Sequence, residues 1–241
     1  MVDNIPFLSV IIPVYNAERH IGDAVRSILC ECYISLEIIA VDDGSTDNSA
    51  EILKSFSEVT YYKQANSGPA AARNLGVRMS KGDFILFLDA DDLFPAGKIR
   101  QQLSYFEQRP EIEIVMGKSQ FFFEDGSSKT VFRFPDETYQ VLNVLLGSGL
   151  YRRSVFDKVG LFEESLQFSE DFDWFNRVRE LGIPILVTDD IALYYRRHDT
   201  NMTHSMDLVK LKTIQMLKRS LDRRREEGEV RELPKLSEFK S

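Results

Sequence analysis

Clustered carboxylates follow two of the apolar runs in the chain. Asp42 and Asp43 come after "EIIAV", while Asp89, Asp91 and Asp92 come after "FILFL". If both runs are strands of an open α/β sheet, their carboxyl ends face one ligand-binding crevice. Carboxylates crowded there would have raised pKa values unless a cation lay among them. Oxygen ligands of this kind suit Mg²⁺ or Mn²⁺, so the sequence suggests a divalent metal site.

The spacing of the second cluster separates its members. Side chains two apart on an extended backbone point the same way, so Asp89 and Asp91 can reach one ion while Asp92 is turned elsewhere. An ordinary explanation is that these acids cap a turn before "LFPAGKI", a common place for Asp. Spacing alone does not decide between the two interpretations.

Three further groups of residues also have two interpretations. The segment "DDGSTDNS" is an Asp-Gly turn with a helix cap, or a ligand loop. Arg73 follows three alanines, where a ligand or another backbone can approach closely, yet surface arginines are the usual case. Glu170 and Asp171 begin a predicted helix, where acids are favoured by the free N–H groups and the dipole in any protein.

Apolar runs alternate with helical patterns through the first half of the chain. This order predicts a mostly parallel sheet flanked by helices, a Rossmann-like α/β fold. The predicted strands lie in "FLSVIIPVY", "LEIIAVDD", "VTYYKQ" and "DFILFLDADD", and each is followed by a helix or a loop.

The second half changes in pattern. Residues 111–134 suggest strands around a turn at Asp125 and Gly126, so antiparallel pairing is expected there. Helices are predicted at 137–146 and 170–181, and one or two short strands at 183–198. We divide the chain into one domain, 1–205, with halves at 7–118 and 119–205, and a tail at 206–241.

The tail begins with a predicted amphipathic helix. Its apolar stripe predicts packing on the parent domain or on a second copy of the chain, and consists of Leu208, Leu211, Ile214, Leu217 and Leu221. The basic residues beside the stripe would also suit a peripheral membrane helix. Acids interspersed in "REEGEVRE" weaken that second interpretation.

Charge and composition exclude several classes of protein. The formal net charge is -8 over 241 residues, although the tail alone carries +3. An acidic body argues against nonspecific nucleic-acid binding. The start of the chain lacks a basic signal-peptide region, and no apolar run approaches a membrane span. We therefore expect a soluble, cytoplasmic protein in which Cys30 and Cys32 are ordinary thiols.

Six segments in this order resemble the family 2 glycosyltransferases, which have the GT-A fold. The segments are "SVIIPVYNAE" (9–18), "VDDGSTDNS" (41–49), "NSGPAAARNLG" (66–76), "FLDADD" (87–92), "EDFDW" (170–174) and "YRRHDTNMT" (195–203). The resemblance covers residues 7 to 203. It implies an inverting enzyme that moves a sugar from a nucleotide-diphosphate sugar, expected to be a UDP-sugar, to an acceptor hydroxyl.

The resemblance also implies roles for particular residues. Tyr15 would supply a face for the nucleotide base, and Asp43 would accept a hydrogen bond from a uracil N–H. The implied donor-binding set is Pro13, Tyr15, Glu18, Asp43, Asn66, Arg73 and Asp89, and the implied ligands of Mn²⁺ or Mg²⁺ are Asp89, Asp91 and His198.

The catalytic pair implied by the resemblance is Glu170 and Asp171, with Asp171 as the general base. The acceptor would be a glycan or a lipid-linked sugar, as in surface polysaccharide synthesis, and the enzyme would work in the cytoplasm or at the inner face of the cell membrane. Residues 147–152 are a candidate rim of the acceptor site.

Three other classes fit the sequence less well. A sugar-nucleotide pyrophosphorylase would carry a Gly-rich, Arg-containing loop where this chain has "PVYNAERH". A phosphoryl-accepting receiver domain would be about half as long. A catalytically silent nucleotide-sugar or metal-binding module would not need the Glu170-Asp171 pair beside a complete Asp-x-Asp.

Overall fold

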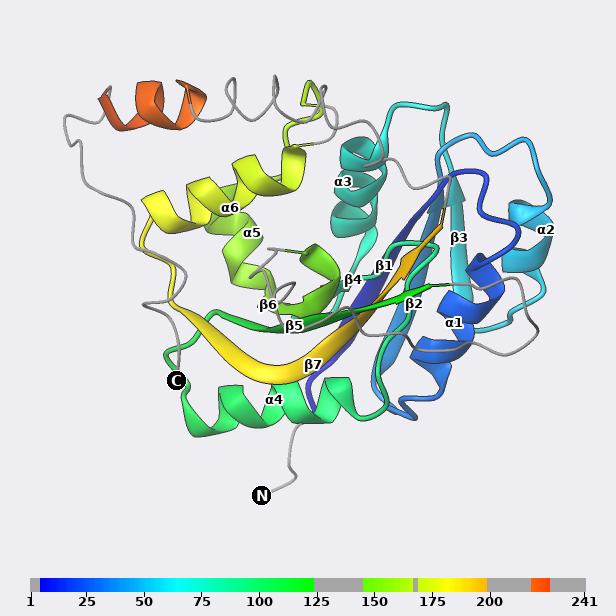
Figure 1. The fold of residues 1–241 in the computed structure, drawn as a ribbon, viewed down its shortest axis with the longest axis horizontal. Helices are drawn as coiled ribbons and strands as arrows, with labels where there is room; N and C mark the ends of the chain where they lie inside the picture. Colours follow the sequence, from blue (N-terminus) through cyan, green and yellow to red (C-terminus); the bar gives the residue numbers. More distant parts are fainter. Residues whose placement is uncertain (1–4, 124–144, 167–168, 199–217, 226–241) are drawn as a thin grey trace.

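The computed structural model describes residues 5–123, 145–166, 169–198 and 218–225, which form a seven-stranded sheet with helices on both faces (Figure 1). The strand order is β3-β2-β1-β4-β6-β5-β7. The strands are β1 (Leu8–Val14), β2 (Leu36–Asp42), β3 (Val59–Lys63), β4 (Phe84–Phe87), β5 (Ile114–Phe123), β6 (Gly149–Arg152) and β7 (Ile185–Arg197).

Six helices and one 3₁₀ turn cover the sheet in two layers. The layer of α1, α2 and α4 contributes to one core cluster, and the layer of α3, α5 and α6 contributes to a second on the opposite face. Their bounds are α1 (Ile21–Leu29), α2 (Ser49–Lys54), α3 (Pro69–Met79), α4 (Lys98–Gln108), η2 (Leu146–Ser148), α5 (Arg153–Val159) and α6 (Glu170–Glu180).

The first four strands confirm the parallel sheet expected from the sequence. β1 pairs in parallel with β2 on one side and with β4 on the other, and β2 pairs in parallel with β3. Every residue of β1 except Pro13 is buried. Because helices cover both faces, the strand is apolar at every position except Ser9 instead of alternating with polar residues.

α3 lies directly against β1. A Cβ added at Gly76 would stand 2.3 Å from Cγ2 of Ile11, so only glycine allows the helix to approach this closely. Pro69 stands at the start of α3, after Gly68 with φ of +91°. A proline costs no hydrogen bond in the first turn. The small residues of "GPAAARNLG" therefore serve helix packing here.

The second half differs from expectation in two places. β5 pairs antiparallel with β6, as expected for this region, but parallel with β7. β7 is one strand of 13 residues instead of one or two short ones. The expected turn at residues 125–126, and all but the last two residues of the expected helix 137–146, lie outside the described residues.

The proposed acceptor rim at residues 147–152 is wrong in the structure. These residues form the end of η2 and the strand β6, and all but Arg152 are buried. Tyr151 contacts Trp174 and Phe156 inside the second core cluster. Side chains enclosed in this way cannot present a surface to an acceptor.

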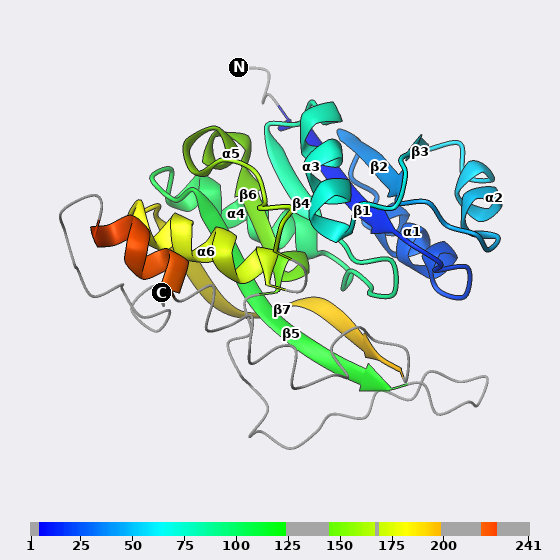
Figure 2. The same ribbon diagram turned by 90° about the horizontal axis from the view of Figure 1, so that it is seen from above.

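Residues 218–225 of the tail form a helix beside α6 (Figure 2). Their described contacts are polar: Ser220 donates to Glu180, and Arg223 donates to Glu180 and Asp173. Leu221, the member of the predicted stripe that is described, is 39% exposed. Tail and domain therefore meet, as expected, but through charged pairs, and the other stripe residues lie outside the described part of the chain.

Candidate functional site

The predicted site residues gather at the carboxyl ends of β1, β2 and β4. Tyr15 follows β1, Asp43 follows β2, and Asp89 stands two residues after β4. The chain runs outward from β1 to β2 and β3 on one side, and to β4 on the other. This reversal of strand order is a topological switch point, where open α/β sheets form their ligand crevice.

Asp43 organises the loop that leads into α3. Its Oδ1 accepts from the Ser67 N–H at 2.8 Å and from Nε2 of Gln64 at 2.8 Å, and its Oδ2 accepts from the Gly68 N–H at 2.8 Å. Asn66, which is exposed, lies within this loop. Asp43 and Asn66 thus belong to one structural unit at the site.

Asp42, the neighbour of Asp43, has a different environment. It is fully buried and accepts from the Ser45 N–H at 2.7 Å and from the Tyr61 hydroxyl at 2.6 Å. These bonds hold the pKa of Asp42 below its usual value against the opposing effect of burial. Asp42 therefore supports the loop and does not face the crevice.

The remaining residues of the first motif differ in accessibility. The Tyr15 side chain is 53% exposed, which leaves a ring face open to a planar ligand. Pro13 is partly buried within β1. Glu18 accepts from the N–H and Nδ2 of Asn48 at 3.0 and 2.8 Å, so its carboxylate holds the residue that precedes α2. Its expected role in donor binding stays a prediction.

Asp91 and His198 form a close pair at the end of the sheet. Asp91 Oδ2 lies 3.0 Å from Nε2 of His198, although 107 residues separate the two in sequence. Burial and the charge of Asp89 raise the pKa of Asp91. The negative charge here is only partly compensated, which is the condition that a cation would relieve.

The donor set suits a divalent cation that also binds substrate. Within the described ranges no cluster of three or more His, Cys, Asp or Glu side chains could hold a metal. Mg²⁺ and related ions are commonly held by one or two protein carboxylates together with substrate phosphates. Asp91 and His198, with Asp89 nearby in sequence, fit that arrangement.

Asp92, the third aspartate after β4, holds the loop that follows this strand in place. Asp92 is buried and its Oδ1 accepts from the Arg196 N–H at 2.9 Å, while Nε of Arg196 donates to the Asp91 carbonyl at 2.8 Å. Leu93 and Tyr194 exchange two backbone hydrogen bonds of 3.0 Å. The end of β7 is thereby fastened to residues 91–93, which agrees with the expectation that Asp92 turns away from Asp89 and Asp91.

The two acidic motifs meet at Arg73. Its Nη2 donates to Asp89 Oδ1 at 2.8 Å, and its Nη1 donates to Glu170 Oε1 at 2.8 Å. Asp171, the second residue of α6, is partly buried. Burial and the charge of Glu170 raise the pKa of Asp171 to about 7, against the opposing effect of Arg73. A carboxylate with this pKa can take up a proton at neutral pH.

Two residues near Asp91 and His198 could not be found from their spacing in the sequence. The ring of His20, just before α1, has its centroid 5.0 Å from that of His198. Arg196 stands two residues before His198, inside the sixth segment, but no role was expected for it. No sequence spacing relates either residue to the acidic motif. Arg196 comes close to the loop after β4 only because β7 is placed there by long-range strand pairing.

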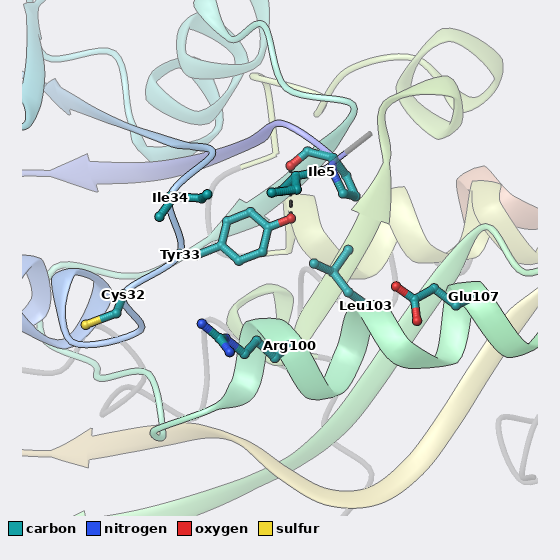
Figure 3. Close-up of a pocket in the computed structure, with 8 residues that line it drawn as sticks. Ile5, Cys32, Tyr33, Ile34, Arg100, Leu103 and Glu107 are labelled. Carbon is teal, nitrogen blue, oxygen red and sulfur yellow. Dashed lines mark hydrogen bonds between the residues drawn. The ribbon is translucent and has the colours of Figure 1, made fainter. Parts of the chain in front are cut away.

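A separate pocket lies at the opposite edge of the sheet (Figure 3). It has a volume of about 380 Å³ and is lined by Ile5, Pro6, Cys32, Tyr33, Ile34, Arg100, Leu103 and Glu107. Ile5 and Pro6 precede β1, and Ile34 precedes β2, so this pocket faces the amino ends of the parallel strands. It is not the crevice that holds the acidic residues. Cys32 and Cys30 are free thiols.

Comparison with known proteins decides the family. Residues 9–160 match the model of glycosyl transferase family 2, and this stretch contains the first four of the six segments and ends just after α5. The chain belongs to glycosyl transferase family 2. The resemblance expected from the six segments is thereby confirmed, and the chain is a glycosyltransferase.

Relatives of this family 2 glycosyltransferase include bacterial proteins. It is 30% identical over 214 residues to an uncharacterised glycosyltransferase of Rickettsia typhi, covering 83% of this chain and 67% of that protein. It is 32% identical to the minor teichoic acid biosynthesis protein GgaA of Bacillus subtilis, covering 70% and 42%. The chain thus spans about two thirds of the first relative and less than half of the second.

Solved structures share the GT-A fold of this glycosyltransferase. TarS of S. aureus in complex with UDP has a TM-score of 0.65 at 21% identity, covering 90% of this chain and 71% of that one. The mannosyltransferase PcManGT of Pyrobaculum calidifontis, in complex with GDP-Man and Mn²⁺, has a TM-score of 0.70 at 19% identity, covering 96% and 67%. The predicted fold is confirmed.

Proposed function

We propose that this protein transfers a sugar, with inversion at the anomeric carbon, from a nucleotide-diphosphate sugar to an acceptor hydroxyl with the help of Mn²⁺ or Mg²⁺. One observation carries the proposal: Arg73 bonds both Asp89 and Glu170, so the Asp-x-Asp motif and the Glu-Asp pair share one site. A donor and an acceptor would therefore meet between them.

The donor side is supported by an exposed aromatic ring and by a buried carboxylate that has acceptor positions to spare. Tyr15 offers an exposed ring on which a nucleotide base can stack, and Asp43 keeps acceptor capacity beyond its three hydrogen bonds because a carboxylate has about four lone-pair positions. UDP and GDP-Man in the complexes of TarS and PcManGT support a nucleotide-sugar donor. We favour a UDP-sugar because Asp43 can accept from the uracil N–H.

The metal would be held by Asp91 and His198, with Asp89 reaching either the metal or the ribose. When bound there, a divalent cation neutralises negative charge that develops on the leaving diphosphate. The chain itself keeps the two ligands in register through the bonds between Arg196 and residues 91–92. This charge compensation is strongest in the transition state, where it lowers the barrier.

The acceptor side centres on Asp171. As the acceptor oxygen attacks the anomeric carbon, its proton must leave, and a carboxylate with a pKa near 7 is suited to receive it. Direct attack opposite the leaving group requires no covalent nucleophile, so Cys30 and Cys32 have no task in the reaction. The alternative of a silent binding module gives no reason for tuning the pKa of Asp171.

The acceptor is proposed to be a growing glycan or a lipid-linked sugar. GgaA is described as a teichoic acid biosynthesis protein, and the pneumococcal relative GlyA as a glycosyltransferase. The first name supports a role in making a cell-surface polymer, and the second supports glycosyl transfer. Mass spectrometry of products from a panel of donors and acceptors would identify the pair.

Calorimetric titration tests the donor and the metal together. We expect UDP to bind in the presence of Mn²⁺, with GDP and ADP at least about tenfold weaker and with UDP binding lost when the metal is chelated. A tenfold change is about 1.4 kcal/mol, the size of one charge-assisted hydrogen bond. Binding that is equally tight without metal, or no nucleotide binding at all, would count against the proposal.

A further inference from the structure

One buried cation joins two halves of the site that are far apart in sequence. The Arg73 side chain is 9% exposed and the Glu170 side chain 6% exposed, and they lie 97 residues apart. The second amino group of Arg73 reaches Asp89, which stands on the loop after β4. A planar guanidinium can serve two carboxylates in fixed directions, which a lysine ammonium cannot do.

The charges around Asp171 come from several elements. Glu170 precedes it on α6, Arg73 approaches from α3, Asp89 from the loop after β4, and the Tyr151 hydroxyl from β6. Arg73 is the cation among these four groups. Its charge favours the ionised form of Asp171, while Glu170 and Asp89 disfavour it.

The hydrogen bond between Arg73 and Glu170 does not satisfy all polar atoms of the two side chains. Nε of Arg73 and Oε2 of Glu170 are both buried without a hydrogen-bond partner in the described part of the chain. A pair that served only to hold the fold would be expected to satisfy these atoms, because buried polar groups without partners cost stability.

We propose that Arg73 is a positioning residue that acts through Glu170, holding Asp171 beside Asp89 and setting the balance of charge around it. The inference rests on the function proposed above. It reassigns Arg73, which the resemblance placed among the donor contacts, and it separates Glu170 from Asp171: Glu170 receives Arg73, and Asp171 alone takes the proton.

The pH dependence of kcat tests this assignment with three variants: Arg73→Met, Glu170→Gln and the double variant. Removal of the cation should move the acid limb of kcat to higher pH, and removal of the Glu170 charge should move it to lower pH. In the double variant the two shifts should largely cancel. Each single variant should lose about tenfold or more in kcat, and the double variant no more than the worse single one.

Nucleotide affinity distinguishes the proposal from direct donor contact. Glu170→Gln should leave the Kd for UDP with Mn²⁺ within about threefold of the wild type, because Glu170 would not touch the nucleotide. Arg73→Lys keeps the positive charge but cannot bond two carboxylates in fixed directions. It should therefore lower kcat without shifting the acid limb of the kcat–pH profile. Arg78→Met, at an exposed position on the same helix, is the matched control and should change neither quantity.

Two results would overturn the inference. The first is additive loss of kcat in the double variant with an unmoved acid limb. The second is weaker nucleotide binding in Arg73→Met as its main effect, which would make Arg73 a donor contact. If the wild type turned over no donor, the proposed function would fail instead, and a double-mutant cycle on the free energy of unfolding would still show whether Arg73 and Glu170 are coupled.

Discussion

At the scale of single residues, the five acids that end β2 and follow β4 have separate roles. Asp42, Asp43 and Asp92 are all buried and accept backbone N–H groups, and Asp43 in this way organises the loop before α3. Asp89 and Asp91 remain for ligands, and each already meets one basic partner, Arg73 or His198. Repulsion among so many carboxylates is thus reduced by protein groups before any metal binds.

Asp171→Asn should abolish transfer and leave donor binding intact. The amide cannot take up the proton of the acceptor hydroxyl, so kcat should fall by about 10²-fold or more, the size of a general-base contribution. The Kd for UDP with Mn²⁺, measured by calorimetry, should stay close to that of the wild type. Parallel loss of binding and turnover would remove Asp171 from the role of base.

The same substitution should stabilise the unliganded protein at alkaline pH. The pKa of Asp171 is raised from 3.8 to about 7 by burial, so the folded state prefers the protonated form. Stability is therefore lost as pH rises from about 4 through 7, and Asp171→Asn avoids that loss. Urea unfolding at pH 8 should show a more stable variant, with the difference vanishing near pH 4.

At the scale of elements, the last residues of β7 determine where the Asp-x-Asp loop lies. Tyr194 pairs with Leu93, Arg196 bonds Asp91 and Asp92, and His198 reaches Asp91. The strand can do this because it pairs in parallel with β5 at both of its ends, with register shifts around Lys118 between them. One long strand was therefore required here, where short ones would end before the site.

Asp92→Ala should weaken metal binding through this attachment. The substitution leaves the buried Arg196 N–H without its acceptor, which costs about 1–3 kcal/mol of stability. The loop would loosen, and the affinity for Mn²⁺ in the presence of UDP should fall. Asp92→Asn keeps an acceptor oxygen and should lose much less in both calorimetry and urea unfolding. Equal effects of the two substitutions would show that charge matters here, not attachment.

At the scale of the whole molecule, the tail and the domain meet through ion pairs at α6. Arg223 bonds both Asp173 and Glu180, whose side chains are almost fully buried. Among the described residues no helix is long and apolar enough to cross a membrane. Membrane contact through the tail, a homodimer and a location at the inner face of the membrane stay predictions.

Arg223→Ala should lower the free energy of unfolding by about 1–2 kcal/mol, because two acids lose a charged donor. Arg225→Ala is the matched control, since that side chain is mostly exposed and its described pair with Asp222 is 4.0 Å long. Urea unfolding compares the two. Co-sedimentation with anionic vesicles should show little difference between the variants, because the Arg223 contacts serve the domain; a large loss of vesicle binding in Arg223→Ala alone would contradict this.

Local patterns in the sequence were sufficient for the first half of the fold and for the family. Apolar runs with carboxylates at their ends predict parallel strands and a site, because strand burial and turn preference are local properties. The apolar segment ending at Asp89, Asp91 and Asp92 is such a case. The resemblance of the six ordered motifs to the family 2 glycosyltransferases then predicted what these acids do.

Only the tertiary structure decided which residues make direct contact, although the family resemblance had already grouped Asp91 with His198. The pairs Arg73–Glu170 and Asp91–His198 join positions 97 and 107 residues apart, and no local spacing encodes such contacts. The mistaken acceptor rim at 147–152 has the same origin, since burial of β6 depends on β4 and β5 on either side of it. Sequence therefore determined the chemical groups and their strands, while long-range strand pairing and helix packing determined their partners, because those contacts depend on the assembled sheet.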